Sequence, residues 1–277
     1  MSIAGKTVLV TGAGRGFGWG IAVALAGAGA TVVVTDVNEV DVERTVQQIQ
    51  DSGGDAFGYR LDVADDTAFG HVVKQTLERT GSIYGLIHSA IYMPLAPFEE
   101  TTKEEWQRQL DVGLGGLFHG VKAVWEAMVD GGSGHIVGIA SGSSVRGYHN
   151  EVPYCAVKHA QEGFVKALAL EAREHHIAVN TVGPGKPIKT TRVTWEELEK
   201  LPEEQKATWA DPKDLGLAFV WLLGQPPTRF SGLRFDAGPI VETLRSEGEA
   251  FIVSPDKVTL YPEDFEVRQD WFNSYSA

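Results

Sequence analysis

The sequence predicts a single α/β domain with a doubly wound, seven-stranded parallel sheet and helices on both faces. Short β-branched runs alternate with amphipathic segments from residue 6 to residue 236, which is the pattern of repeated strand–helix–strand units. A glycine-rich loop follows the first run and opens a helix. The chain has 277 residues, of which 43% are hydrophobic, and this is enough for one sizeable core.

The strands are predicted from seven runs in which valine, isoleucine and threonine are frequent. In chain order they cover residues 7–11, 31–36, 56–62, 85–89, 135–140, 177–183 and 233–237. Helical segments lie between most of them, so we expect consecutive strands to run parallel. No internal repeat or linker divides the chain before residue 237, and the alternation ends after Asp236.

We expect the domain to comprise residues 1–245. The C-terminal residues 246–277 then form an acidic extension beyond it. The extension carries phenylalanine, tyrosine and tryptophan side chains, and disordered tails are usually poor in aromatic residues. We therefore expect it to pack on its own domain or on a neighbouring subunit.

Composition excludes several classes of partner. The formal net charge of −13 disfavours binding to nucleic acid and to anionic membrane surfaces. Cys155 is the single cysteine, so no internal disulfide is possible. No apolar run has the length of a membrane span, and a strand pattern begins within a few residues of Met1. We expect a soluble cytoplasmic protein.

The first strand leads into TGAGRGFG, residues 11–18, with glycines at Gly12, Gly16 and Gly18. This spacing differs from the common GxGxxG because Phe17 stands where that form requires glycine. Such glycines let the backbone approach a pyrophosphate, which then lies at the positive N-terminus of the following helix. The loop predicts dinucleotide binding.

Asp36 ends the second strand, 24 residues after Gly12. A carboxylate there can bind an adenosine ribose diol and would repel a 2′-phosphate, so it favours NAD over NADP. Arg15 has the opposite tendency, because an arginine in the loop could reach such a phosphate. We give Asp36 more weight, since it would touch the ribose itself.

Several motifs in order make the chain resemble the short-chain dehydrogenase/reductase family over residues 6–238. TGAGRGFG resembles the family's TGxxxGxG, and LDV at 61–63 is similar to its adenine-binding stretch. YCAVK, from Tyr154 to Lys158, matches YxxxK with Ser141 at the serine position, and NTVGPG at 180–185 resembles NxxxPG. The resemblance implies a Rossmann-type fold and a homo-oligomer, most simply a tetramer.

The family mechanism implies roles for three residues. The i, i+4 spacing puts Tyr154 and Lys158 on one helix face. Tyr154 would be the acid/base, Lys158 would lower its pKa and bind the nicotinamide ribose, and Ser141 would orient the substrate. The implied NAD-binding residues are Gly12, Arg15, Gly16, Phe17, Gly18, Asp36, Asp62, Val63, Ser89, Ala90, Tyr154, Lys158, Pro184, Gly185, Ile188 and Thr190. We expect no metal in the site.

Two positions depart from the family pattern. Thr102 and Glu105 predict a capped helix, yet Gly113, Gly115 and Gly116 interrupt it, and each glycine costs about 1 kcal/mol relative to alanine. Gly116 matches a family glycine that permits close packing, whereas Gly113 replaces the active-site asparagine that holds a water beside the lysine. We expect a second water to fill the space, so that Gly113→Asn keeps or raises turnover.

The second departure is HSAI, residues 88–91, where the family reads NNAG. Ile91 adds bulk near the nicotinamide ribose. His88 could replace the hydrogen bonds of an asparagine between strands, and we expect it to be structural and not catalytic.

The sequence gives the least information about the residues that would bind the substrate. Residues 186–210 would form a lid, and the candidate pocket residues are Met93, Ser143, Arg146, His149 and Trp195. We expect a small-molecule substrate and NAD-linked oxidation of a secondary alcohol, polyol or sugar. The alternatives are a catalytically weak or silent NAD-binding regulator, and a lyase or dehalogenase without nicotinamide, which Asp36 and the intact glycine loop disfavour.

Overall fold

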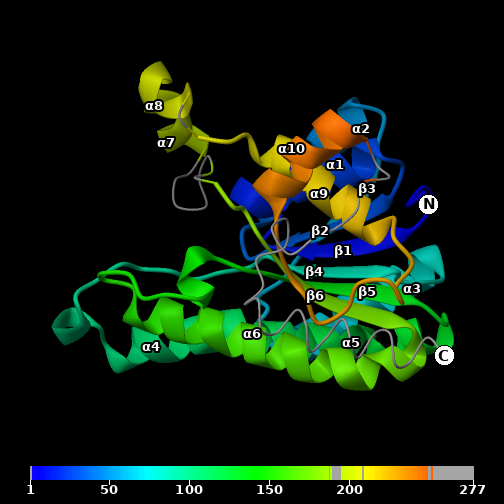
Figure 1. The fold of residues 1–277 in the computed structure, drawn as a ribbon, viewed down its shortest axis with the longest axis horizontal. Coiled ribbons are helices and arrows are strands. Elements are labelled where there is room, and N and C mark those ends of the chain that lie inside the picture. The colour runs from blue at the N-terminus through cyan, green and yellow to red at the C-terminus, as the bar shows by residue number, and fades with distance from the viewer. Residues whose placement is uncertain (1, 187, 189–194, 208, 249–250, 252–277) are drawn as a thin grey trace.

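The sheet of the computed structural model contains seven parallel strands in the order β3-β2-β1-β4-β5-β6-β7, which confirms the predicted fold class (Figure 1). The structure describes residues 2–186, 188, 195–207, 209–248 and 251. The strands are β1 Thr7–Thr11, β2 Thr31–Asp36, β3 Asp55–Arg60, β4 Gly85–His88, β5 Gly134–Ile139, β6 Ile177–Gly183 and β7 Arg234–Asp236. All seven lie within two residues of their predicted bounds.

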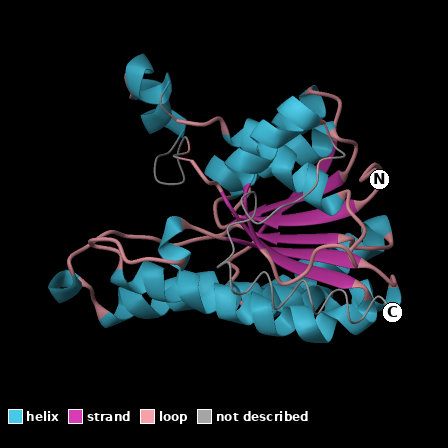
Figure 2. Ribbon diagram, in the orientation of Figure 1, coloured by secondary structure: helices cyan, strands magenta, loops and turns pink. Residues whose placement is uncertain are grey.

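Helices cover both faces of this sheet (Figure 2). α1, α2, α9 and α10 lie on one face, and α3, α4, α5 and α6 lie on the other. Their bounds are α1 Gly16–Gly27, α2 Glu39–Asp51, α3 Asp66–Thr80, α4 Lys103–Leu110, α5 Gly116–Asp130, α6 Val152–Ala172, α9 Pro212–Leu223 and α10 Ala237–Glu247. Two short helices, α7 Trp195–Lys200 and α8 Glu203–Ala207, lie in the expected lid segment and extend from the body of the domain (Figure 1).

Side chains of β1 alternate between the two hydrophobic cores. Val8 and Val10 pack with the helices of the first face, while Leu9 packs with those of the second. A strand that is buried on both faces carries an unbroken apolar run, as TVLVT does. Because β1 pairs with β2 on one side and β4 on the other, the strand order reverses there, and its carboxyl end is the place where open α/β sheets bind ligands.

The helix with three glycines is continuous but contains a five-residue π-helix, Asp111–Gly115, between α4 and α5. The capping box of Thr102 and Glu105 at the start of α4 is confirmed. A short π segment widens a helix locally and is frequent at functional sites. Two of the three glycines, Gly113 and Gly115, fall inside it.

The chain after β7 differs from the sequence prediction in one respect. The alternation was expected to end at Asp236, whereas α10 follows directly and packs on α9. Within the expected extension the structure describes residues 246–248 and Phe251, whose ring is buried and stacks on Trp221 at a centroid distance of 4.9 Å. In the part of the chain that the structure describes, no helix is both long and apolar enough to cross a membrane.

Candidate active site

Three positions in and after the loop between β1 and α1 require glycine, namely Gly12, Gly16 and Gly18. Gly12 and Gly16 have φ angles of +61° and +59°, in the left-handed region. A Cβ on Gly12 would lie 2.7 Å from the backbone of Ala90, and one on Gly18 would lie 2.2 Å from the Gly12 carbonyl oxygen. These contacts leave a backbone cradle at the N-terminus of α1, which suits a pyrophosphate.

Phe17 explains why the loop departs from GxGxxG. Its side chain is buried and meets Phe219 edge-to-face at 5.5 Å, so it belongs to the core between α1 and α9. Only the backbone of Phe17 is left to face a bound phosphate.

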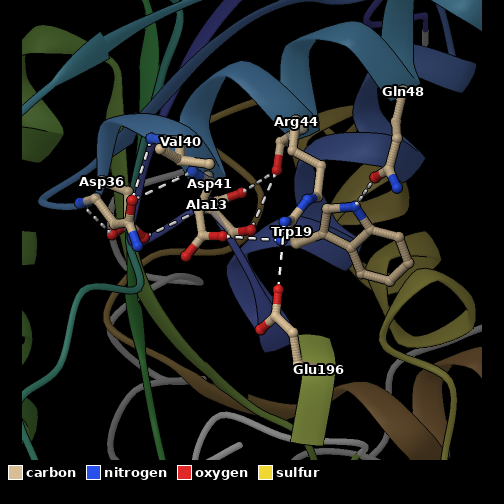
Figure 3. Close-up of polar contacts among 11 residues, drawn as sticks. Ala13, Trp19, Asp36, Val40, Asp41, Arg44, Gln48 and Glu196 are labelled. Carbon is tan, nitrogen blue, oxygen red and sulfur yellow. Dashed lines mark hydrogen bonds and ion pairs between the residues drawn. The ribbon is translucent and has the colours of Figure 1, made fainter. Parts of the chain in front are cut away.

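Asp36 is held at the end of β2 by backbone donors (Figure 3). Its Oδ2 accepts a hydrogen bond from Gly14 N at 3.1 Å and its Oδ1 accepts one from Asn38 N at 3.1 Å. A second carboxylate, Asp41, lies close by, and burial together with the charge of Asp36 raises the pKa of Asp41. Arg44 pairs with Asp41 at 3.1 Å and reaches Glu196 of α7 at 3.6 Å. Acidic groups therefore dominate this end of the site.

One cleft contains nine of the sixteen residues that sequence analysis assigned to NAD. The nine are Gly12, Arg15, Phe17, Gly18, Asp36, Asp62, Val63, Ser89 and Ala90. Arg108 also lines this cleft and was not predicted. It donates a hydrogen bond to Asp62 at 2.8 Å, and despite partial burial this bond and one from Ala64 N lower the pKa of Asp62.

The three proposed catalytic residues come from the segment after β5 and from α6. Ser141 follows β5 and caps a short 3-10 helix, and its carbonyl accepts a hydrogen bond from Arg234 at 3.0 Å. Tyr154 and Lys158 both lie on α6, with the ammonium 5.6 Å from the centroid of the tyrosine ring. Lys158 is fully buried, and this burial lowers its pKa to about 8.

The other predicted NAD residues that the structure describes do not line this cleft. Gly16 starts α1, and Pro184 and Gly185 follow β6, where Gly185 has φ +66°. Ile188 forms a bridge with Ala210. Thr190 lies outside the described residues. The roles assigned to all sixteen residues stay predictions.

Comparison with known proteins decides the family. A family model described as short chain dehydrogenase matches residues 6–201, which is more than half of the chain. The chain belongs to the short-chain dehydrogenase family.

Relatives of this short-chain dehydrogenase are named for alcohol substrates. The chain is 34% identical over 183 residues to the 2,5-dichloro-2,5-cyclohexadiene-1,4-diol dehydrogenase LinX of Sphingobium indicum, covering 66% of this chain and 73% of the relative. It is 31% identical over 236 residues to cyclohexanol dehydrogenase of Acinetobacter sp., covering 83% and 92%. A metagenomic short-chain oxidoreductase, solved in complex with NADP, has a TM-score of 0.71 at 25% identity over 83% of this chain and 96% of that chain.

The structure corrects our expectation for Gly113 in this short-chain dehydrogenase. A Cβ on Gly113 would lie 2.4 Å from Cγ1 of Val157, a buried residue of α6. The space is therefore filled by Val157 and not by water, and Gly113→Asn would clash instead of restoring turnover. Close packing at Gly116 is confirmed, since a Cβ there would lie 2.6 Å from Val63 Cγ2. A Cβ on Gly115 would lie no closer than 3.6 Å to the atoms around it, and nothing in the structure explains this glycine.

His88 is structural, as expected for a histidine at this strand end. Its ring is buried, and burial is the main reason that its pKa falls to about 3. The Gly113 carbonyl can only accept, so Nε2 donates to it at 3.0 Å, and Nδ1 then accepts from the Thr11 hydroxyl at 3.1 Å. His88 thus ties β1 and β4 to the π-helix. Ile91 lines the same cleft as Gly12 and Asp36, and its expected place near a nicotinamide ribose stays a prediction.

The predicted pocket residues differ in their surroundings. Ser143 is buried, donates a hydrogen bond to Glu151 at 2.7 Å and lies 3.4 Å from the Ser141 hydroxyl. Arg146 is exposed and bonds the hydroxyl of Tyr148 at 2.7 Å. His149 is exposed and Met93 half-buried, while the side chain of Trp195 lies outside the described part.

Two groups around the catalytic residues were not predicted from the sequence. Arg234 of β7 pairs with Glu162 of α6 at 3.6 Å behind Ser141, and their side chains are 7% and 12% exposed. Gln161 bonds Lys158 at 2.9 Å. No motif marks Arg234 or Gln161, because Arg234 meets Glu162 from a distant part of the chain and Gln161 bonds the distant Gly113 as well as its neighbour Lys158.

Proposed function

We propose that the protein is an NAD-dependent dehydrogenase that oxidises a secondary alcohol, with a cyclic alcohol or diol as the first class to test. The proposal is supported most by the buried Lys158 ammonium beside the ring of Tyr154, one turn apart on α6. The family match and relatives named for cyclohexanol and a cyclohexadiene diol support the substrate class.

The residues present fit a dinucleotide. The cradle made by Gly12 and Gly18 is closed to any Cβ, and Asp36 stands at the end of β2 where a ribose diol would bind. Bound NAD⁺ would supply the acceptor for a hydride at its nicotinamide ring. Pro184 and Gly185 would lie beside that ring, and the cleft residues would hold the adenosine and phosphates.

Side chains of the protein remove the hydroxyl proton of the alcohol. Lys158, as an ammonium, stabilises the phenolate form of Tyr154. The phenolate takes the hydroxyl proton of the alcohol while the hydride leaves the carbinol carbon, so that the C–H and O–H bonds break and a C=O bond forms. The Ser141 hydroxyl holds the substrate oxygen during this change. Reduction of a ketone runs the same steps in reverse.

NAD is preferred over NADP because the 2′-phosphate would meet acidic groups. Asp36 would lie against the phosphate, and Asp41 adds a second carboxylate close behind it. Arg15 is exposed and could partly offset this repulsion. One solved relative binds NADP, so the preference has to be measured on this chain.

A homo-oligomer, most simply a tetramer, is also proposed. α4, α5 and α6 lie side by side on one face of the molecule (Figure 1). They expose large apolar side chains, namely Trp106, Phe118, Val152 and Leu170. Apolar helix faces of this kind need a further partner. Phe251 packed on Trp221 supports docking of the acidic extension on its own domain.

The test is a turnover screen over cyclic alcohols, diols, polyols and sugars with NAD⁺ and NADP⁺ in parallel. The proposal expects NAD⁺ reduction with at least one secondary alcohol. Cofactor binding without turnover on any of them would instead support the silent NAD-binding regulator. Gly113 was the main ground for that alternative, and its space is filled by Val157.

A further inference from the structure

Lys158 is held on two sides by hydrogen bonds that stay inside the protein. Its Nζ donates to the Ile139 carbonyl oxygen at 2.6 Å and to Oε1 of Gln161 at 2.9 Å. Lys158 and Gln161 are 3% and 2% exposed, so bulk water does not reach either side chain easily. Two of the three N–H groups of the ammonium are used in these bonds.

The orientation of the Gln161 amide is determined by its partners. An ammonium has only donors, so the atom that faces Lys158 must be the amide oxygen. The amide nitrogen then faces the other way and donates to the carbonyl oxygen of Gly113 at 2.9 Å. Both ends of this side chain are therefore satisfied, and a flipped amide would lose both bonds.

The Gly113 carbonyl is itself held in place. It accepts a second hydrogen bond from His88 Nε2 at 3.0 Å. His88 is neutral and anchored to Thr11 at the end of β1. A buried chain of bonds thus runs from the sheet through His88, the π-helix and Gln161 to the ammonium of Lys158.

The fit between two helices lets Gln161 reach this position. With glycine at 113, Val157 of α6 packs directly over the π-helix. One turn further along α6, Gln161 then lies against the Gly113 carbonyl. A larger residue at 113 would push α6 away and break this contact.

We propose that Gln161 is a positioning residue for Lys158, and that its amide takes the place of solvent between the lysine ammonium and the Gly113 carbonyl. The inference deepens the proposed dehydrogenase function and rests on it. Gln161 holds the ammonium in place beside Tyr154 and supplies one of the acceptors that keep it charged. Because an amide does not exchange protons as water does, the proton taken up by Tyr154 has to leave on another side of the site.

Few titratable groups lie close enough to Lys158 to change its pKa. In the described part of the chain, the titratable groups that face it are Tyr154 and Glu162 on α6 and His88 on β4. Glu162 favours the ammonium but is itself paired with Arg234, and His88 is neutral. Since burial already lowers the pKa of Lys158 to about 8, the loss of one acceptor should lower it further.

The first experiment compares Gln161→Met with Gln161→Ala in alcohol oxidation. Methionine fills the space but bonds neither partner, whereas alanine leaves a polar space in which one water can bridge Lys158 and Gly113. We expect the order of kcat to be wild type, then Gln161→Ala, then Gln161→Met. In Gln161→Met, the pH of half-maximal oxidation should rise by about one to two units, because Tyr154 keeps its proton longer. NAD binding should be nearly unchanged.

Gln109→Met is the matched control. Gln109 is also a buried glutamine, 3% exposed, and its Oε1 has no hydrogen-bond partner among the described residues. This variant should leave the pH profile unchanged. If Gln161→Met is more active than Gln161→Ala, or if neither variant moves the pH profile, Gln161 only fills space and the proposal is wrong.

A second readout does not depend on turnover. The pKa of Lys158 can be followed by NMR of ¹³C-labelled lysine side chains, with the resonance assigned by Lys158→Met. We expect this pKa to fall in Gln161→Met and to stay at the wild-type value in Gln109→Met. An unchanged pKa in Gln161→Met would overturn the positioning role. If the pKa falls but the wild type oxidises no alcohol, the positioning role stands and the proposed function fails instead.

Discussion

Val157 occupies the space into which a side chain at position 113 would project, with its Cγ1 only 2.4 Å from an ideal Cβ on Gly113. The two residues belong to neighbouring helices, the π-helix between α4 and α5 and the long helix α6. Val157 is 1% exposed and has little room to move aside. The glycine at 113 and the valine at 157 are thus complementary in size.

The first prediction concerns this fit. Gly113→Ala should lower the free energy of unfolding by about 1–3 kcal/mol, because overpacking a tight contact outweighs the gain in helix propensity. Gly113→Asn should do the same and lose turnover. Chemical denaturation measures the change.

The neighbouring glycine provides the control for that prediction. A Cβ on Gly115 would make only ordinary van der Waals contacts, so Gly115→Ala should leave the free energy of unfolding unchanged or raise it by up to about 1 kcal/mol. In the double variant Gly113→Ala with Val157→Ala, the loss should be smaller than the sum of the two single losses. Additive losses would show that the two side chains do not compete for one space.

A second prediction follows from the buried histidines. The folded-state pKa values of His88 and His135 are about 3 and about 4, below the ordinary value, so the unfolded chain binds more protons than the folded one between these values and about 6.5. The two neutral histidines therefore make their full contribution to the free energy of unfolding above about pH 6.5. As the pH falls below this value, the free energy of unfolding declines by up to about 1.4 kcal/mol per pH unit for each histidine.

His88→Asn tests this directly, because asparagine is the residue that the family pattern has there. Between pH 4 and 6, the plot of unfolding free energy against pH should become shallower. The change in slope should be about that of one proton taken up on unfolding, which is about 1.4 kcal/mol per pH unit. His135→Asn should produce a similar change. A slope that stays the same in His88→Asn would mean that this histidine titrates normally in the folded protein.

A third prediction concerns the cofactor. NAD(H) should bind at least about tenfold tighter than NADP(H), because a 2′-phosphate would place like charges together beside Asp36. Asp36→Ala should weaken NAD binding and bring the two affinities closer. Calorimetry measures both, and equal or tighter NADP(H) binding by the wild type would refute the preference.

The fold was predictable because its signals are local. The runs at 7–11, 31–36 and 177–183 match β1, β2 and β6 residue for residue, since a strand buried on both faces reads as continuous β-branched sequence. Glycines that need positive φ marked the phosphate loop in the same way. Helix α10 was missed, although the domain was predicted to reach residue 245, because the strand–helix alternation ends with the last strand.

The surroundings of the catalytic residues were less predictable. Gly113 looked like a lost side chain because Val157, its partner, is distant in sequence and meets it only when α6 packs on the π-helix. Gln161 belongs to no motif, and its role depends on which atoms face each end of its amide. Such relationships arise from tertiary packing, which spacing and composition do not contain.

The most direct test of the account is the turnover number of Tyr154→Phe with NAD⁺ and the best secondary alcohol from the screen. The phenylalanine keeps the ring beside Lys158 but cannot accept a proton. We predict that kcat falls by about a hundredfold to ten-thousandfold while the Kd for NAD(H) stays nearly unchanged. Turnover equal to that of the wild type would mean that the proton is taken by another group, and the dehydrogenase mechanism proposed for this site would be wrong.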